Sequence, residues 1–264
     1  MTDDELLRYS RHLLLDDIGV EGQEQLAKAR VLVVGAGGLG SPVALYLASA
    51  GVGHLTIADG DHVELTNLQR QIAHDSSRLG VAKAASAARS ALALNPGVAV
   101  VAVVERLAGE RLEWLVGEHD VVVDCSDNFA TRQAINAACV RRRRPLVSGA
   151  AIGFDGQIAT FDHRLAGSPC YACVFPPTPA AVDVACSAMG VFAPLVGIIG
   201  SMQAAEALKL MLGIGTSLAG RLLMLEARGM EWTEMRYERD PACSICAVDA
   251  MPGAAAAVAP AALA

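Results

Sequence analysis

The sequence predicts an α/β fold: a Rossmann-like domain with a mostly parallel sheet that continues into an antiparallel portion. Two observations support this prediction. Short apolar strands alternate with helical segments up to about residue 150, which is typical of a parallel sheet covered by helices on both faces. In addition, the strand at 31–34 leads directly into the glycine-rich turn GAGGLG at 35–40 and then into a helical run. This order is typical of the start of a βαβ unit.

Apolar periodicity and stop signals give the expected elements in order. Strands are expected at 31–34, 54–58, 98–104, 120–124, 146–149, 156–161, 221–226 and 232–237. Helices are expected at 3–16, 40–50, 82–94, 112–116, 131–143 and about 194–212. The proline-rich stretch 175–181 is expected to be a flexible loop, and the last two strands resemble a closing antiparallel pair.

The length of 264 residues and a hydrophobic content of 53% predict one large domain with a substantial core. We expect this domain to span residues 1–248, with one half at about 1–150 and the other at about 151–248. The Ala/Pro-rich tail 249–264 lacks periodicity and is expected to be disordered.

Composition also limits the class of function. The net charge of −7 argues against general nucleic-acid binding. The chain opens with Met-Thr-Asp-Asp-Glu, which is not typical of a signal peptide. The apolar stretch 191–200 contains glycine and proline and is followed by polar residues at helical spacing, so we interpret it as a buried helix and not a membrane span. A soluble cytoplasmic protein is expected.

The stretch 31–70 predicts a nucleotide site. Gly35 allows a tight turn, Gly37 and Gly38 let backbone N–H groups approach a phosphate, and Gly40 completes the motif before the helix. Asp59, at the end of the second strand, can accept hydrogen bonds from ribose hydroxyls. A nicotinamide cofactor has two phosphates, and the glycine loop serves both. The additional charges of Arg70 and Lys83 therefore suggest a triphosphate.

Four of the seven cysteines form two Cys-x-x-Cys pairs, Cys170 with Cys173 and Cys243 with Cys246. Two such pairs supply four thiolates for a tetrahedral Zn²⁺ that would connect two distant segments. Four protein ligands leave no open position, so the zinc is expected to be structural. Redox dithiols or disulfides are the alternatives, and a cytoplasmic location disfavours disulfides.

Cys186 follows the proline-rich stretch and precedes the predicted buried helix. A thiol on a mobile loop beside an activated acyl group could act as a nucleophile. The alternative is a loop cysteine without a chemical role, and the residues alone leave both open.

An ordered set of motifs resembles the MoeB/ThiF family, the bacterial relatives of ubiquitin-activating E1 enzymes, over residues 5–247. These motifs are RYSRH (8–12), GAGGLG (35–40), ASAGVGHLTIADGD (48–61), LTNLQRQ (65–71), Lys83, DCSDN (124–128), TRQAINAAC (131–139), PLVSGAAIGFDGQI (145–158), both cysteine pairs and APLVGIIGSMQAAEALK (193–209). One glycine motif would be weak evidence, but this ordered set is specific.

The resemblance implies ATP-dependent adenylation of the C-terminal Gly-Gly carboxylate of a ubiquitin-like sulfur-carrier protein. It implies that Gly38 lies against the phosphates, that Asp59 holds the ribose, and that Asp127 binds Mg²⁺ beside Asn128. The segment Thr66, Asn67, Leu68, Gln69 and Arg70, together with Lys83, is expected to face the nucleotide. Arg11 would reach the ATP of the partner subunit in a homodimer.

Further expectations follow from the resemblance. Some relatives carry a rhodanese domain for which this chain has no room, so a separate sulfur donor protein is expected. A family cysteine at the Cys186 position takes part in sulfur transfer in some members and is dispensable in others. Asp127 has a simpler interpretation as a helix N-cap, and Arg11 as a solvated helix residue.

The sequence does not decide which type of sulfur-carrier protein is the substrate. RYSRH, LLLDDIG and TRQAINAACV favour the thiamine-type carrier, whereas GAAI and APLVGIIGS favour the molybdenum-cofactor type. We favour the molybdopterin pathway slightly, and one enzyme could serve both carriers. An NAD-dependent dehydrogenase and a non-catalytic zinc-containing scaffold for a ubiquitin-like protein are the alternatives from other classes.

Overall fold

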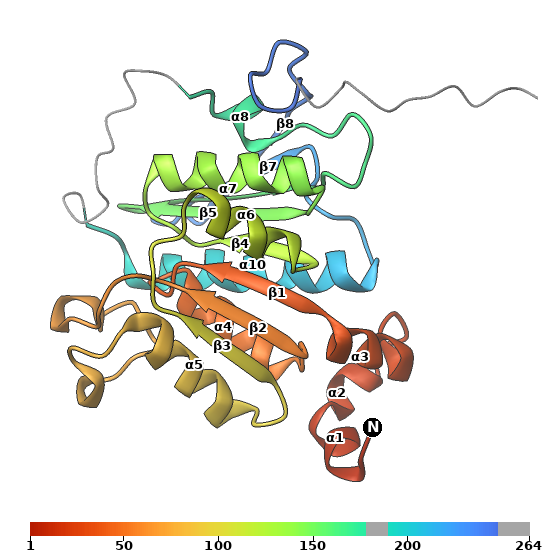
Figure 1. Ribbon diagram of the computed structural model, residues 1–264, viewed down its shortest axis with the longest axis vertical. Helices are drawn as coiled ribbons and strands as arrows, with labels where there is room; N and C mark the ends of the chain where they lie inside the picture. The colour runs from red at the N-terminus through yellow and green to blue at the C-terminus, as the bar shows by residue number, and fades with distance from the viewer. Residues whose placement is uncertain (178–189, 248–264) are drawn as a thin grey trace, which may run out of the picture.

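A computed structural model describes residues 1–177 and 190–247. Its centre is one eight-stranded sheet with the order β3-β2-β1-β4-β5-β6-β7-β8 (Figure 1). The strands are β1 Arg30–Val34, β2 His54–Ala58, β3 Ala99–Val103, β4 Val121–Asp124, β5 Leu146–Ile152, β6 Asp155–Phe161, β7 Arg221–Glu226 and β8 Glu231–Arg236. Pairs from β3 to β5 are parallel, and pairs from β5 to β8 are antiparallel. The predicted fold class is confirmed.

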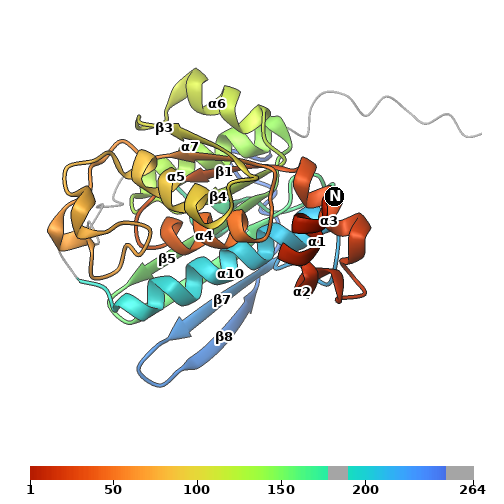
Figure 2. The same ribbon diagram turned by 90° about the horizontal axis from the view of Figure 1, so that it is seen from below.

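Helices cover both faces of the parallel part of the sheet (Figure 2). The main helices are α4 Gly40–Ser49, α5 Lys83–Leu94, α6 Gly109–Gly117, α7 Phe129–Arg142 and α10 Ala193–Leu212. Helices α4, α5 and α10 lie on one face, where Val43 and Ile199 join the larger apolar core. Helices α6 and α7 lie on the other face, where Leu112 and Ile135 join a second core. Both faces are buried, which explains the continuous apolar runs of the central strands.

The N-terminal region differs from the prediction. The predicted helix 3–16 is two helices, α1 Asp3–Arg8 and α2 Ser10–Leu13. The break falls at Tyr9, whose hydroxyl accepts a hydrogen bond of 2.8 Å from Nδ2 of Asn95. A third helix, α3 Gly19–Lys28, was not predicted; its two glycines weaken the helical signal. It forms because Leu26 is fully buried against the larger core.

Helix α10 is a core element of the protein. Leu195 and Ile199 are fully buried, and so is the polar residue Gln203. Within the described residues it is the one helix that is long and apolar enough to cross a membrane, and 56% of that window is buried inside the protein. Its burial agrees with the expected buried helix. The short helix α8 Tyr171–Val174 and the 3-10 helices η1 Leu65–Asn67 and η2 Ser76–Arg78 complete the described elements.

Candidate functional site

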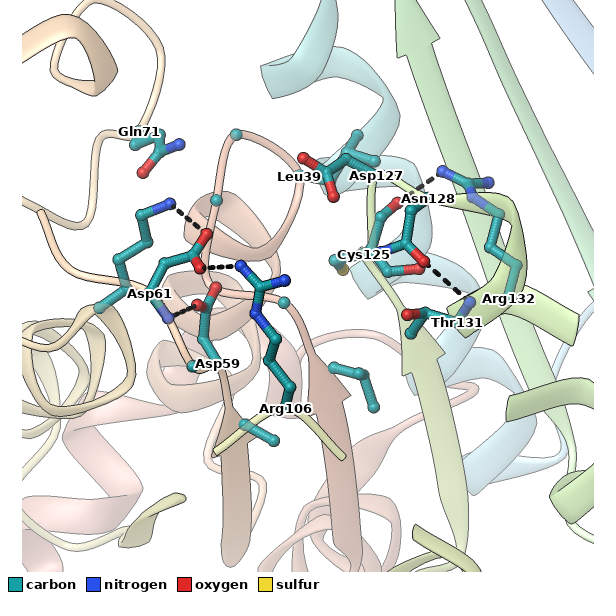
Figure 3. A pocket seen from close by; sticks show the side chains of 18 of the residues that line it. Leu39, Asp59, Asp61, Gln71, Arg106, Cys125, Asp127, Asn128, Thr131 and Arg132 are labelled. Atoms are coloured by element: carbon teal, nitrogen blue, oxygen red, sulfur yellow. Dashed lines mark hydrogen bonds and ion pairs between the residues drawn. The ribbon is translucent and has the colours of Figure 1, made fainter. Parts of the chain in front are cut away.

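A cavity of about 340 Å³ opens at the carboxyl ends of β1, β2 and β4 (Figure 3). The strand order reverses between β1 and β4, because β2 follows β1 on one side and β4 flanks it on the other. Open α/β sheets bind ligands at such a topological switch point. The lining of the cavity includes eight of the predicted site residues: Gly35, Gly37, Gly38, Asp59, Arg70, Lys83, Asp127 and Asn128.

The glycine loop turns sharply between β1 and α4. Gly35 has a φ of +99°, and a Cβ there would lie 2.6 Å from the carbonyl oxygen of Cys125. Only glycine fits this position without displacement of the neighbouring strand end. The loop then leads into α4, which begins at Gly40. The free N–H groups and positive dipole end of a ten-residue helix therefore border the cavity, as in anion-binding sites.

Two side chains fix the conformation of this loop at Ala36. Oδ2 of Asp59 accepts a hydrogen bond of 2.7 Å from the Ala36 N–H. Nε2 of His74 lies 2.8 Å from the Ala36 carbonyl oxygen, and because a carbonyl only accepts, Nε2 is the donor. Burial lowers the pKa of His74 below its ordinary value. The loop is therefore held rigid by a carboxylate and a neutral imidazole.

Two cationic side chains of the cavity lining, Arg70 and Lys83, come from the segment after β2 and from the start of α5. Nη1 of Arg70 donates a hydrogen bond of 3.1 Å to the carbonyl oxygen of Thr66. The Asn67 carbonyl accepts from the Arg70 N–H at 3.1 Å. Lys83 is buried at the first position of α5, with Nζ 3.2 Å from Oδ2 of Asp61. This arrangement concentrates positive charge where the glycine loop also offers backbone donors.

Asp127 and Asn128 follow β4 at the cavity wall. Oδ1 of Asn128 accepts a hydrogen bond of 2.9 Å from the Thr131 N–H, so Asn128 is the N-cap of α7. The interpretation of Asp127 as this N-cap was wrong, because the helix begins at Phe129 and its N-cap is Asn128. Asp127 is exposed on the cavity side, where its carboxylate is accessible to a ligand.

Other predicted residues lie outside the cavity lining. These are Arg11, Gly40, Thr66, Asn67, Leu68 and Gln69. Arg11 is exposed on α2, and Thr66 and Asn67 act on Arg70 through their backbone. Cys186, most of the stretch 175–181 and the tail 249–264 lie outside the described residues.

Asp61, Gln71 and Arg106 are among the polar residues of the cavity lining that sequence reasoning missed. Gln71 is 4% exposed, and its Oε1 has no hydrogen-bond partner among the described residues. Asp61 and Arg106 lie in the loops that follow β2 and β3. Polar residues after neighbouring parallel strands meet at one sheet edge, and this signal could have identified both.

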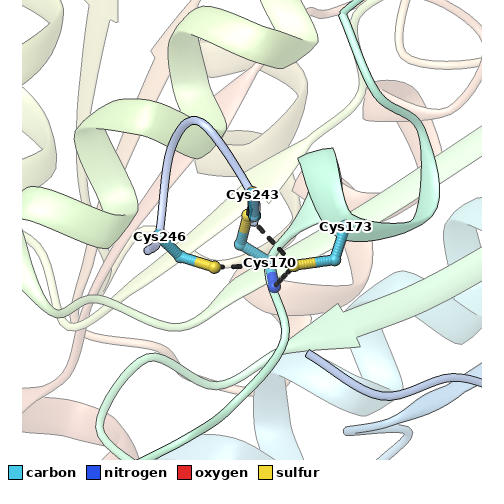
Figure 4. A group of neighbouring side chains, drawn as sticks. All are labelled: Cys170, Cys173, Cys243 and Cys246. Carbon is cyan, nitrogen blue, oxygen red and sulfur yellow. Dashed lines mark hydrogen bonds between the residues drawn. The ribbon is translucent and has the colours of Figure 1, made fainter. Parts of the chain in front are cut away.

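The four paired cysteines form a second cluster (Figure 4). Their sulfur atoms all lie within 4.8 Å of one another. The Sγ–Sγ distances are 3.7 Å for Cys170–Cys243, 3.9 Å for Cys170–Cys173 and 3.5 Å for Cys173–Cys246. Four thiolates at about 2.3 Å from a tetrahedral Zn²⁺ are separated by about 3.8 Å. The cluster therefore fits zinc, whereas disulfide bonds of about 2.05 Å do not match these distances.

The sequence relationships agree with this geometry. The ThiF family matches residues 9–245. The chain belongs to the ThiF family. The resemblance of the sequence motifs to MoeB and ThiF is thereby confirmed.

Three relatives illustrate the relationship. The molybdopterin-synthase adenylyltransferase of Escherichia coli is 44% identical over 93% of this chain and 98% of its own length. The ThiS adenylyltransferase of E. coli is 43% identical over 93% of this chain and 97% of its length. The adenylyltransferase and sulfurtransferase MOCS3-1 of Zea mays is 46% identical over 92% of this chain, which spans 52% of that relative.

Solved structures agree with the fold. E. coli MccB with ATP superimposes with a TM-score of 0.77 at 22% identity, covering 91% of this chain and 74% of that chain. At this identity, the likeness concerns the fold alone.

Proposed function

We propose that the protein adenylates the C-terminal glycine carboxylate of a ubiquitin-like sulfur-carrier protein and releases pyrophosphate. The observation that carries this proposal is the cavity in which the glycine loop and Asp59 face Arg70 and Lys83. A dinucleotide needs only the first two features, whereas a triphosphate also uses the two cations. The names of the E. coli and Zea mays adenylyltransferases support the same reaction.

The proposed chemistry is displacement at the α-phosphorus of ATP. The attacking carboxylate is already ionised, so the reaction needs no general base. Negative charge accumulates on the departing pyrophosphate, and the preorganised cations Arg70 and Lys83 would stabilise it. When bound, Mg²⁺ would neutralise further charge on the phosphates, and the oxygens of Asp127 and Asn128 are suitable ligands.

The proposal includes a homodimer, because Arg11 lies outside the cavity of its own chain. An exposed arginine on α2 is available to a second copy of the chain. The proposal also includes structural zinc in the cysteine cluster, a separate sulfur donor protein and a cytoplasmic location. A role for Cys186 in sulfur transfer stays a prediction from the sequence.

The choice of carrier belongs to the proposal as well. We favour the carrier of molybdenum cofactor biosynthesis, as in the E. coli molybdopterin-synthase adenylyltransferase. The second candidate is the thiamine carrier, which the E. coli ThiS adenylyltransferase supports at nearly equal identity. Membership of the ThiF family argues against the dehydrogenase alternative. The residues Arg70 and Lys83 in the cavity argue against a non-catalytic scaffold.

Carrier-dependent exchange of radiolabelled pyrophosphate into ATP tests the function. The purified protein is mixed with MgATP, labelled pyrophosphate and either a molybdopterin-type or a thiamine-type carrier ending in Gly-Gly. Exchange with one carrier and not with the same carrier lacking its last glycine would support adenylation and identify the pathway. No exchange with either carrier would contradict the proposed function.

A further inference from the structure

Asp61 joins three segments at the cavity. Its Oδ2 lies 3.2 Å from Nζ of Lys83, and its Oδ1 lies 2.9 Å from Nη2 of Arg106 (Figure 3). Its carbonyl oxygen accepts a hydrogen bond of 2.8 Å from the Lys83 N–H. Asp61 follows β2, Lys83 begins α5 and Arg106 follows β3. Asp61 therefore contacts Lys83 through both its side chain and its main chain.

Asp61 is itself fixed by the residue that borders the glycine loop. Its N–H donates a hydrogen bond of 2.8 Å to Oδ1 of Asp59, whose other oxygen holds Ala36. One continuous set of hydrogen bonds thus runs from the glycine loop through Asp59 and Asp61 to Lys83. Through it, the ammonium group is placed relative to the backbone donors of the loop.

The exposure of the three charged side chains differs strongly. The Lys83 side chain is 10% exposed, that of Asp61 46% and that of Arg106 85%. An exposed ion pair contributes little to stability, so the Asp61–Arg106 contact is not a major stabilising interaction. The buried ammonium is different, because a lysine has a flexible four-carbon stem and needs a partner to occupy one position.

Gly60 allows Arg106 to approach. A Cβ at Gly60 would lie 2.7 Å from Cγ of Arg106 and 3.0 Å from its backbone nitrogen. The loop after β3 therefore packs directly on the loop after β2. Arg106 shares the carboxylate with Lys83, and the three side chains together carry one net positive charge.

We propose that Asp61 is a positioning residue of the nucleotide site, which directs the ammonium of Lys83 into the cavity while Arg106 shares its carboxylate. This inference rests on the proposed function. Among the described residues Lys83 uses one of its three N–H donors, on Asp61, which leaves two for a phosphate. Arg106 contacts the same carboxylate, so the negative charge of Asp61 is shared between two cations. Asp61 therefore competes less strongly with the phosphates for the ammonium of Lys83.

A double-mutant cycle in the full-length protein tests the inference. Wild type, Asp61→Asn, Lys83→Ala and the double variant are compared in carrier-dependent ATP–pyrophosphate exchange at varied ATP. We expect Asp61→Asn to lower kcat by about 10-fold with a smaller change in KM, within the range of coupling between contacting residues. In the Lys83→Ala background the same change should have no further effect, because Asp61 acts through Lys83.

Glu113→Gln is the matched control. Glu113 also binds two cations, with Arg141 at 3.3 Å and Arg142 at 3.3 Å, but it does not line the cavity. Its variant should keep wild-type kcat. Asp61→Glu retains the charge and should recover part of the loss, which a purely structural role of Asp61 would not predict. The unfolding midpoint of each variant shows whether it folds.

Two results would overturn the inference: wild-type kcat in Asp61→Asn, or equal effects of Asp61→Asn with and without Lys83. Absence of exchange in the wild type would instead contradict the proposed function. In that case the rise in unfolding temperature produced by MgATP is compared in the same four proteins. If Asp61→Asn and Lys83→Ala each reduce this rise and the double variant shows the sum of both reductions, Asp61 does not act through Lys83. This result would overturn the role of Asp61 whatever reaction the protein catalyses.

Discussion

Nε2 of Gln203 donates a hydrogen bond of 2.7 Å to the main-chain carbonyl of Asp124, 79 residues earlier in the chain. Gln203 is fully buried on α10, and Asp124 ends β4 beside the cavity. The helix that supports the antiparallel part of the sheet is thereby connected to the edge of the parallel part that borders the cavity.

Gln203→Leu should lower the free energy of unfolding by about 1–3 kcal/mol, because it leaves a buried carbonyl without this donor. Chemical denaturation measures the loss. Gln25→Leu is a suitable control, since Gln25 also donates to a main-chain carbonyl, that of Met211, but from an exposed side chain and in a part-buried contact. Equal stability of Gln203→Leu and wild type would show that the bond contributes little.

Lys83→Ala should reduce carrier-dependent ATP–pyrophosphate exchange by about 10²-fold or more, as expected for loss of a preorganised charge. Lys28→Ala removes an exposed lysine at the end of α3 and should leave exchange unchanged. Undiminished exchange in Lys83→Ala would remove this residue from the proposed chemistry.

Arg11 is expected to act on the cavity of the partner subunit. Arg11→Ala and Lys83→Ala should each be strongly impaired alone, and mixing the two proteins should restore part of the exchange activity through hybrid dimers that hold one intact site. Native mass spectrometry verifies that subunits exchange. If hybrid dimers form and remain inactive, the two residues do not share a site in this way.

Metal analysis should find about one zinc per chain, bound by the four thiolates. Cys243→Ser should release zinc and lower the unfolding temperature, because the C-terminal segment loses its connection to α8. Cys139→Ala should retain the zinc, since this buried cysteine of α7 lies outside the cluster. A zinc-free Cys243→Ser protein with full stability would indicate another role for the cysteine pairs.

Acid should destabilise the protein partly through His163. Burial lowers its pKa to about 4 from an ordinary 6.5, and its Nε2 has no hydrogen-bond partner within the described residues. Between about pH 6.5 and 4 the unfolded state therefore binds more protons than the folded state, so stability declines as pH falls through this window.

The expected slope from one such group is at most about 1.4 kcal/mol per pH unit. His163→Asn removes this group, so the free energy of unfolding should fall less steeply with decreasing pH in the variant than in the wild type. His54→Asn, at an exposed position of β2, is the matched control. A slope identical in wild type and His163→Asn would contradict the assignment.

The sequence predicted the strands well because each carries its own local signal. The central parallel strands are short apolar runs. All eight strands, the exposed β8 included, were predicted within two residues of their observed ends except β5, which continues three residues further. Those additional residues pair only with β6, so their strand conformation depends on a partner distant from the local pattern.

The candidate site was partly determined by the sequence alone. The glycine loop, Asp59, Arg70 and Lys83 belong to motifs in which spacing and residue type indicate a phosphate site, and they meet at one cavity. The cysteine pairs likewise carry their own ligand spacing. The 69 residues between Cys173 and Cys243 did not prevent the prediction, since each pair is a local motif.

Only the tertiary structure decided which charges meet. Asp61 and Arg106 are 45 residues apart and no single motif contains both, but their strands are neighbours in the sheet and end at the same edge. Gln71 lies in the same cavity, and its burial depends on the packing around it. A local sequence pattern encodes backbone conformation and phosphate-binding turns. The pairing of side chains from different strands depends instead on strand order and register, and these arise only when the whole sheet assembles.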